Sequence, residues 1–262
     1  MKKVSLFLFF LLSVLKADIF TLDAGYGVEQ QKIGGYVEGD RSKNYFGVKN
    51  VNPDNDPFTG YFGLKNKNHP YFWIQLSNSI PLIPNVKFQY TKYESSGHSN
   101  YVAANVKLFG KVRIDTVLTD ANTYMSINSY DATMFYTFNP SFFKIDLGLG
   151  ADYWRGKFKL YDNKNKKYII NYEGSIILPY VYGNFESIPY YNFSLLATCK
   201  IAKVGDKHHY DLVGALKYNL KLGIIKPFIK IGYKYKEAYY KEQGYKTKLS
   251  YKGAFVEAGF KF

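Results

Sequence analysis

In IKPFIKIGYKYK, Ile225 to Lys236, two kinds of side chain alternate. Its odd-numbered positions are isoleucine, proline or tyrosine, and its even-numbered positions are lysine except for Phe228 and Gly232. Successive side chains of a β-strand point to opposite faces, so this segment predicts a strand with one apolar face and one polar face. Strands of transmembrane barrels have this pattern, with apolar side chains toward lipid and polar side chains toward the lumen.

The same period of two recurs along the chain. It is clear at residues 142–153 and 191–202, and weaker at 20–28, 72–77, 86–91, 130–138, 176–182, 210–219 and 254–262. In the noisier segment 176–182, the outer face is predicted to hold Ile176, Leu178, Tyr180 and Tyr182. No helical period of useful length competes with this alternation. We therefore predict an all-β, closed antiparallel, up-and-down transmembrane barrel of about ten strands, with about twelve as the alternative.

The N-terminal residues predict export. Met1-Lys2-Lys3 is basic, residues 4–15 are almost wholly apolar, and Leu15-Lys16-Ala17 offers a cleavage site. A membrane-spanning helix needs about 20 apolar residues, so this segment is too short for an anchor. We expect residues 1–17 to be a signal peptide and residues 18–262 to be the barrel.

Composition fits an exported barrel. Tyr (27) and Phe (21) are abundant, and both favour strands, while tyrosine also suits the membrane interface. The single cysteine, Cys199, excludes an intramolecular disulfide, and its apolar surroundings predict an inert thiol. The net charge is +14, and an exported chain meets little nucleic acid, so the phosphates of lipopolysaccharide are the expected anionic partner. Solvated lysine-rich loops explain the charge equally well.

The connections between the predicted strands alternate in length. Short ones lie at residues 81–85, 139–141, 186–190 and 223–226, and long ones at 37–69, 94–123, 160–168 and 238–246. Transmembrane barrels have short periplasmic turns and longer extracellular loops, so both ends of the barrel segment are expected on the periplasmic side. Within the loop 94–123, residues on either side of Gly110 predict an extra hairpin that stands above the membrane.

The final strand, Ala254 to Phe262, has Phe260 and Phe262 on its apolar face. An alternating terminal strand that ends on an aromatic residue resembles the assembly signal of bacterial outer-membrane proteins. The resemblance implies contact with the barrel-assembly machinery through this strand.

Most of residues 18–262 also resembles a family of small Gram-negative outer-membrane β-barrels of poorly characterised function. The similarity lies in Tyr130-Asp131, in the strand IDLGLG at residues 145–150 and in the turn IPLIPN at residues 80–85. It implies the fold and an outer-membrane location, and it supplies no reaction and no cofactor.

Residues that could carry catalysis are few. Asp54, Asp56, Asp206 and His208 resemble the Asp pair and Asp–His pair of omptin-type rim proteases, but the first two lie in the first long loop, whereas the omptin pair belongs to the second. His98-Ser99 has no third partner for phospholipase chemistry. The four histidines, His69, His98, His208 and His209, lack ligand spacing. We predict no catalytic, metal or cofactor-binding residue and expect no enzyme activity.

The predicted lumen holds charges of both signs. Its inward positions include Asp23, Lys87, Asp131, Asp146, Asp152, Lys200, Asp211, Lys217, Lys230, Lys234, Lys236 and Glu257. Mixed signs favour paired charges that close the lumen, because unpaired buried charges are costly. The predicted register gives a cluster of Lys217, Glu257 and Lys230, with Asp211 and Lys236 nearer the outer rim.

The expected function is therefore a structural or surface-interaction role for a barrel with a largely plugged lumen. A lumen lined by one sign of charge would have favoured ion conduction, and a small solute or ion channel remains the alternative. A rim hydrolase of omptin type is the second alternative.

Overall fold

A computed structural model describes residues 20–48, 55–108, 112–220 and 225–262, so the predicted signal peptide lies outside the described residues and stays a prediction. The strands of these residues are β1 (Phe20–Glu38), β2 (Lys43–Gly47), β3 (Thr59–Leu64), β4 (Lys67–Asn78), β5 (Asn85–Ser99), β6 (Val106–Leu108), β7 (Val112–Ile114), β8 (Ala121–Phe138), β9 (Phe143–Asp162), β10 (Lys167–Ser187), β11 (Phe193–Val204), β12 (Lys207–Asn219), β13 (Lys226–Glu242) and β14 (Tyr245–Lys261). No helix in this part of the chain is long and apolar enough to cross a membrane.

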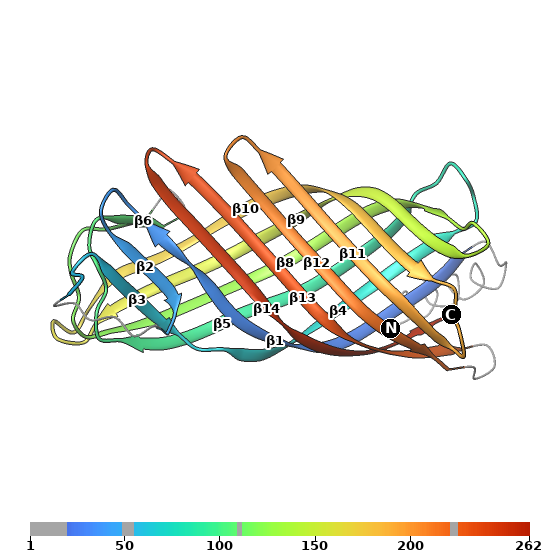
Figure 1. Ribbon diagram of the computed structural model, residues 1–262, viewed down its shortest axis with the longest axis horizontal. Coiled ribbons are helices and arrows are strands. Elements are labelled where there is room, and N and C mark those ends of the chain that lie inside the picture. The colour runs from blue at the N-terminus through green and yellow to red at the C-terminus, as the bar shows by residue number, and fades with distance from the viewer. Residues whose placement is uncertain (1–19, 49–54, 109–111, 221–224) are drawn as a thin grey trace, which may run out of the picture.

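Long antiparallel strands close into a ring (Figure 1). The described residues form one sheet of twelve strands, of which β2 and β3 are short additions inside the first long connection. The other ten pair in the order β1-β4-β5-β8-β9-β10-β11-β12-β13-β14, and β14 pairs back to β1. The prediction of a closed antiparallel barrel is confirmed, and its wall is built from ten long strands.

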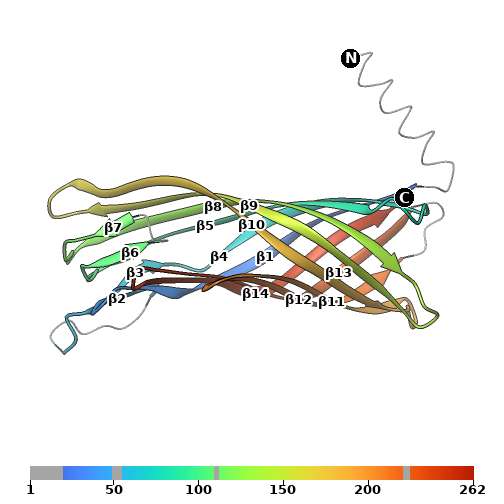
Figure 2. The same cartoon turned by 90° about the horizontal axis from the view of Figure 1, so that it is seen from above.

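The seam between β1 and β14 brings the first and last described residues together. The Leu22 amide donates to the Phe262 carbonyl at 3.1 Å, and the Phe262 amide donates to the Leu22 carbonyl at 2.8 Å. The short connections that follow β4, β8 and β10 lie at this end of the barrel, and β2, β3, β6 and β7 lie at the other (Figure 2). Short turns mark the periplasmic end and long connections the extracellular end.

Along β9, the apolar face changes sides at Trp154. Between the end with the short turns and Trp154, the side chains of Leu147, Leu149 and Tyr153 face outward and are exposed. Above it, lysines face outward, while Phe158 is buried in the interior. β8 changes at Tyr130 and β14 at Ala254 in the same way. An apolar outer face suits lipid and a polar outer face suits water, so the change marks the level at which the wall leaves the membrane.

An aromatic row lies at this level. In the register, Tyr26 is opposite Phe72, and Phe72, Tyr90, Tyr130 and Tyr153 follow on β4, β5, β8 and β9. The ring centroids of Tyr90 and Tyr130 are 5.1 Å apart, and those of Tyr130 and Tyr153 are 6.2 Å apart. Aromatic side chains concentrate at the two interfaces of transmembrane barrels. We call this set the outer aromatic row.

The wall rises well above the membrane. β9 has 20 residues. At about 3.3 Å per residue and a tilt of about 45°, such a strand is about 45 Å tall, whereas the apolar band of an outer-membrane barrel is about 25 Å tall. We call the part beyond the band, roughly 20 Å tall by this difference, the outer stub.

The outer stub explains an error in the predicted loops. Residues 160–168 and 238–246 were expected to be long loops, but β9 and β10 continue to Asp162 and Lys167, and β13 and β14 are joined by Gln243 and Gly244 alone. The prediction failed because it followed an apolar outer face, which stops at the membrane boundary although the strand goes on. The two longest predicted connections, 37–69 and 94–123, are shorter than expected, since β1 runs to Glu38, β4 begins at Lys67, β5 runs to Ser99 and β8 begins at Ala121. The hairpin expected around Gly110 is β6–β7, separate from the ring, and Gly110 itself lies outside the described residues.

The predicted face of residues 176–182 is also wrong. Tyr180 and Tyr182 point inward and are 4% and 3% exposed, while Val181 lies on the lipid side. A shift of one residue moves every side chain to the opposite face. Here Ile176, Ile177 and Leu178 are all apolar, so this part of the sequence contains no alternation from which the faces could be distinguished.

Candidate functional site in the barrel interior

The interior changes character at the level of the outer aromatic row. At membrane height, the inward side chains are mostly polar or charged, and we call them the charged layer. In the outer stub most of the buried side chains are apolar, and we call these the apolar layer. In the described part of the chain, the charged layer includes Asp23, Glu29, Lys87, Asp131, Asp146, Asp152, Glu186, Lys200, Asp211, Lys217, Lys230, Lys234, Lys236 and Glu257.

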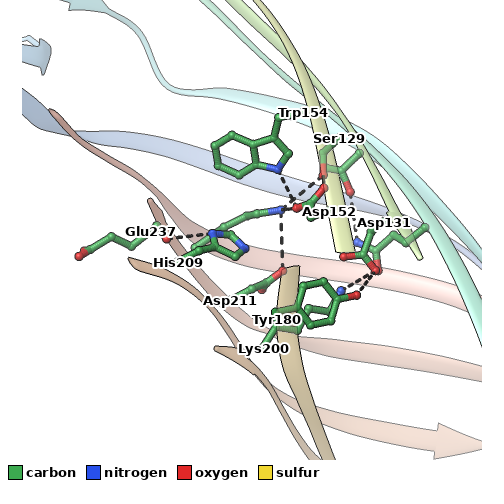
Figure 3. A network of polar contacts seen from close by, with 12 residues as sticks. Ser129, Asp131, Asp152, Trp154, Tyr180, Lys200, His209, Asp211 and Glu237 are labelled. Atoms are coloured by element: carbon green, nitrogen blue, oxygen red, sulfur yellow. Dashed lines mark hydrogen bonds and ion pairs between the residues drawn. The ribbon is translucent and has the colours of Figure 1, made fainter. Parts of the chain in front are cut away.

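Lys236 lies between two carboxylates of the charged layer, Asp152 and Asp211, which are shown in Figure 3. Its ammonium lies 2.7 Å from Asp152 Oδ2 and 3.9 Å from Asp211 Oδ2. Trp154 Nε1 donates to Asp152 Oδ2 at 2.7 Å, and Ser129 Oγ donates to Asp152 Oδ1 at 2.6 Å. All five residues are buried. Both oxygens of the Asp152 carboxylate are therefore hydrogen-bonded as well as ion-paired, which offsets the cost of burying the charge.

Asp131 forms a second paired site in the same region (Figure 3). Lys200 Nζ lies 2.8 Å from Asp131 Oδ1. The Tyr180 hydroxyl donates to the same oxygen at 2.9 Å, and Thr133 Oγ1 donates to it at 3.3 Å. The inward position of Tyr180 thus satisfies a buried carboxylate. Periodicity alone could not identify this contact, because Asp131 and Tyr180 lie on different strands that do not pair.

The predicted pair of Lys230 and Glu257 is brought together. Their charged groups are 2.8 Å apart, and the two residues are register partners on β13 and β14. The Tyr71 hydroxyl donates to the other oxygen of Glu257 at 2.9 Å. Lys234 forms a neighbouring ion pair with Glu29, a residue that was not among the predicted lumen charges.

Lys217 does not join Glu257 as predicted. It lies opposite Lys230 in the register, but its ion pair is with Glu186 Oε1 at 2.8 Å. Glu186 lies on β10, and β11 separates that strand from β12, which carries Lys217. Cross-strand register considers only adjacent strands, whereas long side chains in a lumen also reach strands farther round the ring. The same reason explains why Asp152 on β9 approaches Lys236 more closely than Asp211 does.

The apolar layer fills the outer stub. The two long connections contribute buried side chains to it, and the barrel wall contributes the rest, including Ile33, Val37, Phe158, Leu160 and Leu249. The first connection supplies Phe46, Phe62 and Leu64, and the second supplies Val102, Val106, Leu108, Ile114 and Leu118. The sequence predicts long outer loops with an extra hairpin above the membrane, but not the packing of their side chains into the barrel interior. The apolar residues at Val102, Val106 and Leu108 were a sequence signal of this packing.

Hydrogen bonds hold the two long connections to each other. Asn44 Nδ2 donates to the Ala103 carbonyl at 2.8 Å, and the Ala103 amide donates to Asn44 Oδ1 at 2.8 Å. At the rim, Glu38 Oε2 lies 3.0 Å from Lys43 Nζ and Glu38 Oε1 lies 2.6 Å from Lys246 Nζ. The hydrogen bond from Lys246 holds the pKa of Glu38 below its usual range. The inserted connections are thus tied to one another and to β14.

The protease-like residues make separate contacts. Asp54 lies outside the described residues, and Asp56 Oδ1 accepts the Phe58 amide at 3.1 Å, as a turn residue does. Asp206 pairs with Lys241 at 3.6 Å, and His208 lies 3.3 Å from Glu237. No contact in the described part of the chain joins Asp56 to Asp206 or His208. The described part of the chain also holds no group of three or more His, Cys, Asp or Glu side chains that could bind a metal ion.

The two aromatic residues of the assembly-signal resemblance lie on the outer face. Phe260 and Phe262 are 43% and 38% exposed, on the lipid side of β14 and just beyond its end. Phe262 also makes the backbone hydrogen bonds with Leu22 that end the seam.

No protein-family model and no curated protein sequence matches the chain. Solved structures do align with it over nearly its whole length. They include Ail, the attachment invasion locus protein of Yersinia pestis, in complex with the heparin analogue sucrose octasulfate (10% identity, 92% of this chain and 99% of that chain, TM-score 0.36). The outer membrane protease OmpT from Escherichia coli (10%, 94% and 96%, 0.46) and the translocator domain of the autotransporter NalP from Neisseria meningitidis (12%, 100% and 98%, 0.41) also align.

At such low TM-scores, these likenesses decide nothing about a role. The strand pairing and the apolar outer face carry the assignment themselves, because a closed ring leaves no unpaired strand edge in lipid. The described residues of the chain form a ten-stranded transmembrane β-barrel.

Proposed function

We propose that the protein is a sealed outer-membrane barrel with a structural or surface-interaction role, and that it does not conduct solutes. The observation that carries the proposal is that two successive layers of buried side chains, the charged layer and the apolar layer, fill the lumen. At membrane height, Lys236, Asp152, Asp131 and Lys200 are buried and paired. Above them, side chains such as Phe62, together with the rest of the apolar layer, fill the outer stub.

A conducting pore needs a continuous path of water or of weak polar sites. In this barrel, an ion would have to displace Lys236 from Asp152, whose carboxylate also accepts hydrogen bonds from Trp154 and Ser129. It would then have to cross an apolar layer that offers few polar partners. Each step costs several kcal/mol, because buried pairs and desolvated ions are both expensive to create or break.

Planar-bilayer recording of the purified barrel tests the proposal. We expect no steady, reproducible conductance steps over the voltage range in which the bilayer is stable. Regular conductance steps of constant size from the wild-type protein would contradict a sealed lumen. They would favour a function as a small solute or ion channel.

For the surface role, the outer face of the stub supports lipopolysaccharide as the partner. Directly above the outer aromatic row, Lys92, Asn128 and Arg155 are register partners on β5, β8 and β9. Lys157 and Lys159 follow on β9, and a shallow hollow forms where the short side chains of β8 separate the lysines of β5 and β9. We call Lys92, Arg155, Lys157 and Lys159 the basic patch. Two of these cations are already ion-paired, Lys92 with Glu94 and Lys157 with Glu173. The patch still holds more cations than these two carboxylates neutralise, and cations just above the lipid boundary are placed to meet the phosphate groups of the outer-leaflet glycolipid.

Charge reversal tests this partner. The double variant Lys157→Glu, Lys159→Glu should bind purified lipopolysaccharide at least ten-fold more weakly than wild type, and dephosphorylated lipopolysaccharide should bind both proteins weakly. The matched control is Lys203→Glu, Lys252→Glu, which reverses two exposed lysines on β11 and β14, outside the basic patch. An equal loss of lipopolysaccharide affinity in both variants would mean that only the overall charge matters, and it would contradict a role for the basic patch.

A further inference from the structure

A cavity of about 110 Å³ lies inside the outer stub, next to the β6–β7 hairpin. Its lining is almost wholly apolar and comes from the hairpin and from the inner faces of β8, β9 and β10: Leu108, Met125, Ile127, Trp154, Phe158 and Tyr172. Among the described residues that line it, Lys157 is the one with a charged side chain and belongs to the outer face of β9, and the cavity lies above the charged layer. A water molecule is poorly stabilised in such a space, because it needs two or more polar partners for its hydrogen bonds.

Two glycines line this space. Gly156 on β9 and Gly174 on β10 are register partners, and both line the cavity. A Cβ atom at Gly156 would meet Ile127 Cγ1 at 3.5 Å, an ordinary contact, so the backbone there is not crowded. At Gly174 a Cβ would come within 2.3 Å of the Tyr172 hydroxyl, so this glycine makes room for the Tyr172 side chain. The missing side chain at Gly156 therefore leaves space in the cavity, whereas the space beside Gly174 is occupied by Tyr172.

The barrel wall is incomplete beside the cavity. β10 pairs with β9 along its whole length but with β11 only from Val181 to Glu186. Above Pro179, no strand of the described residues pairs with the second edge of β10. Proline has no N–H to donate to a neighbouring strand, which favours an end of pairing at that point. The β11–β12 hairpin stops lower and leans away from β10 (Figure 1).

This gap in the wall opens near the membrane surface. Ile177 on β10 is the register partner of Tyr153, the last member of the outer aromatic row, and is 64% exposed. Ile176 lines the cavity, and Tyr240 on β13 lines it from the other side of the gap. The cavity thus lies between β10 and β13, at a height where a molecule dissolved in the outer leaflet could reach it from the side.

We infer that this cavity is a binding site for a small, uncharged, apolar molecule that enters sideways between β10 and β13. The ligand is at most about the size of a single aromatic ring, because apolar cavities of about 150 Å³ bind benzene. Its affinity comes from contact with Trp154, Phe158, Ile127 and their neighbours. Such binding needs no conduction through the lumen, so it goes beyond the sealed role proposed above.

Trp154 makes the site measurable. The chain contains two tryptophans, and Trp73 lies in a separate group of side chains at the level of the charged layer, so Trp73→Phe leaves Trp154 as the single fluorescent indole. Titration of this variant with toluene should give a saturable change in Trp154 emission. Partition of toluene into detergent micelles gives a change that rises linearly, and a purely linear response would contradict the site.

Filling the cavity provides the decisive comparison. In the Trp73→Phe background, Gly156→Leu should weaken toluene binding at least ten-fold, since the leucine side chain occupies the cavity. The matched control is Gly214→Leu, because Gly214 is a strand glycine on the lipid side, where an added Cβ would meet no atom of the described residues within 4 Å. If Gly156→Leu does not fold, Ile127→Phe fills the same space from β8. Unchanged toluene affinity in the folded cavity-filling variants would overturn the proposal.

Discussion

The Lys230 ammonium lies 2.8 Å from the Glu257 carboxylate, across the β13–β14 pair in which the two residues are register partners. The side chains are 14% and 6% exposed, so the pair is largely removed from water. The Tyr71 hydroxyl donates to the same carboxylate. Glu257 therefore satisfies two groups that would otherwise be buried without a partner.

Glu257→Ala should destabilise the barrel by about 3–5 kcal/mol, because it leaves the Lys230 charge and the Tyr71 hydroxyl unpaired. Urea unfolding in lipid vesicles measures this loss. The control is Glu173→Ala, which removes an exposed pair with Lys157 on the outer face and should cost about 1 kcal/mol or less. Equal small losses in the two variants would mean that the lumen is well hydrated at Glu257.

Phe62→Ala should loosen the apolar layer without unfolding the ring. Phe62 is fully buried and its ring centroid is 5.2 Å from that of Phe158, so truncation leaves a cavity that costs about 3–5 kcal/mol. Because Phe62 belongs to an inserted connection, the expected result is faster proteolysis of residues 37–69 at unchanged heat stability of the barrel. The lipid-facing Phe88→Ala is the control and should leave proteolysis unchanged. Global unfolding of Phe62→Ala would show instead that the apolar layer and the ring form one cooperative unit.

Acidification should release the rim contacts of the first connection. The pKa of Glu38 is lowered by its hydrogen bond from Lys246, so its pairs stabilise the rim above the ordinary carboxyl pKa and are lost as pH falls through the lowered value. The gain is about 1 kcal/mol or less, since these side chains are partly exposed. Proteolysis of residues 37–69 with an acid-active protease should accelerate below pH 4.5 in wild type, with 4.5 the ordinary carboxyl pKa. In Glu38→Gln, proteolysis should already be fast at neutral pH, and an identical pH profile in both proteins would exclude Glu38 as the cause.

The position of the apolar belt predicts that an outward-facing arginine is costly at Ile229 and tolerated at Lys252. Ile229 is on the outer face of β13, between Tyr218 and Ala258 on the adjacent strands. Ile229→Arg should cost about 2–4 kcal/mol near the bilayer midplane, whereas Lys252→Arg, above the belt, should cost roughly 0–1 kcal/mol. Folding free energies in vesicles measure both. Similar tolerance of the two substitutions would contradict the position of the apolar belt.

The fold was predictable because lipid imposes one rule on every strand. An apolar outer face marks Ile229, Leu147 and Leu195 alike, and it located the ten strands of the ring. The same rule failed above the membrane, where Arg155 and Lys157 face water on a strand that continues. Strand ends in the outer stub could therefore not be found from an apolar outer face.

The candidate site was only partly predictable. Register on adjacent strands placed Lys230 beside Glu257, since a strand neighbour is defined by the sequence once the turn is known. It missed the pairs of Lys217 with Glu186 and of Lys236 with Asp152, because these cross the lumen between strands that do not pair. The inward folding of the two long connections depends on tertiary packing, and strand periodicity contains no information about it.

Two expected roles of Phe262 can be separated by two different changes to this residue. The resemblance to an assembly signal predicts that its aromatic side chain matters while the barrel is being built. The structure adds that its backbone exchanges two hydrogen bonds with Leu22 at the end of the seam. Phe262→Ala removes the side chain and keeps those hydrogen bonds, whereas deletion of Phe262 removes both.

If the side chain acts in assembly, Phe262→Ala should lower the amount of protein in the outer membrane and leave precursor exposed to periplasmic proteolysis. The barrel that does assemble should keep the heat stability of wild type, because Phe262 is 38% exposed on the lipid side and its ring covers little of the protein. The deletion should lower both the amount and the heat stability, since it also breaks the seam. Immunoblots of membrane fractions and heat-modified gel migration measure the two effects. Wild-type amounts of Phe262→Ala would contradict the assembly role, and wild-type heat stability of the deletion would show that the Leu22 contact adds nothing to the finished barrel.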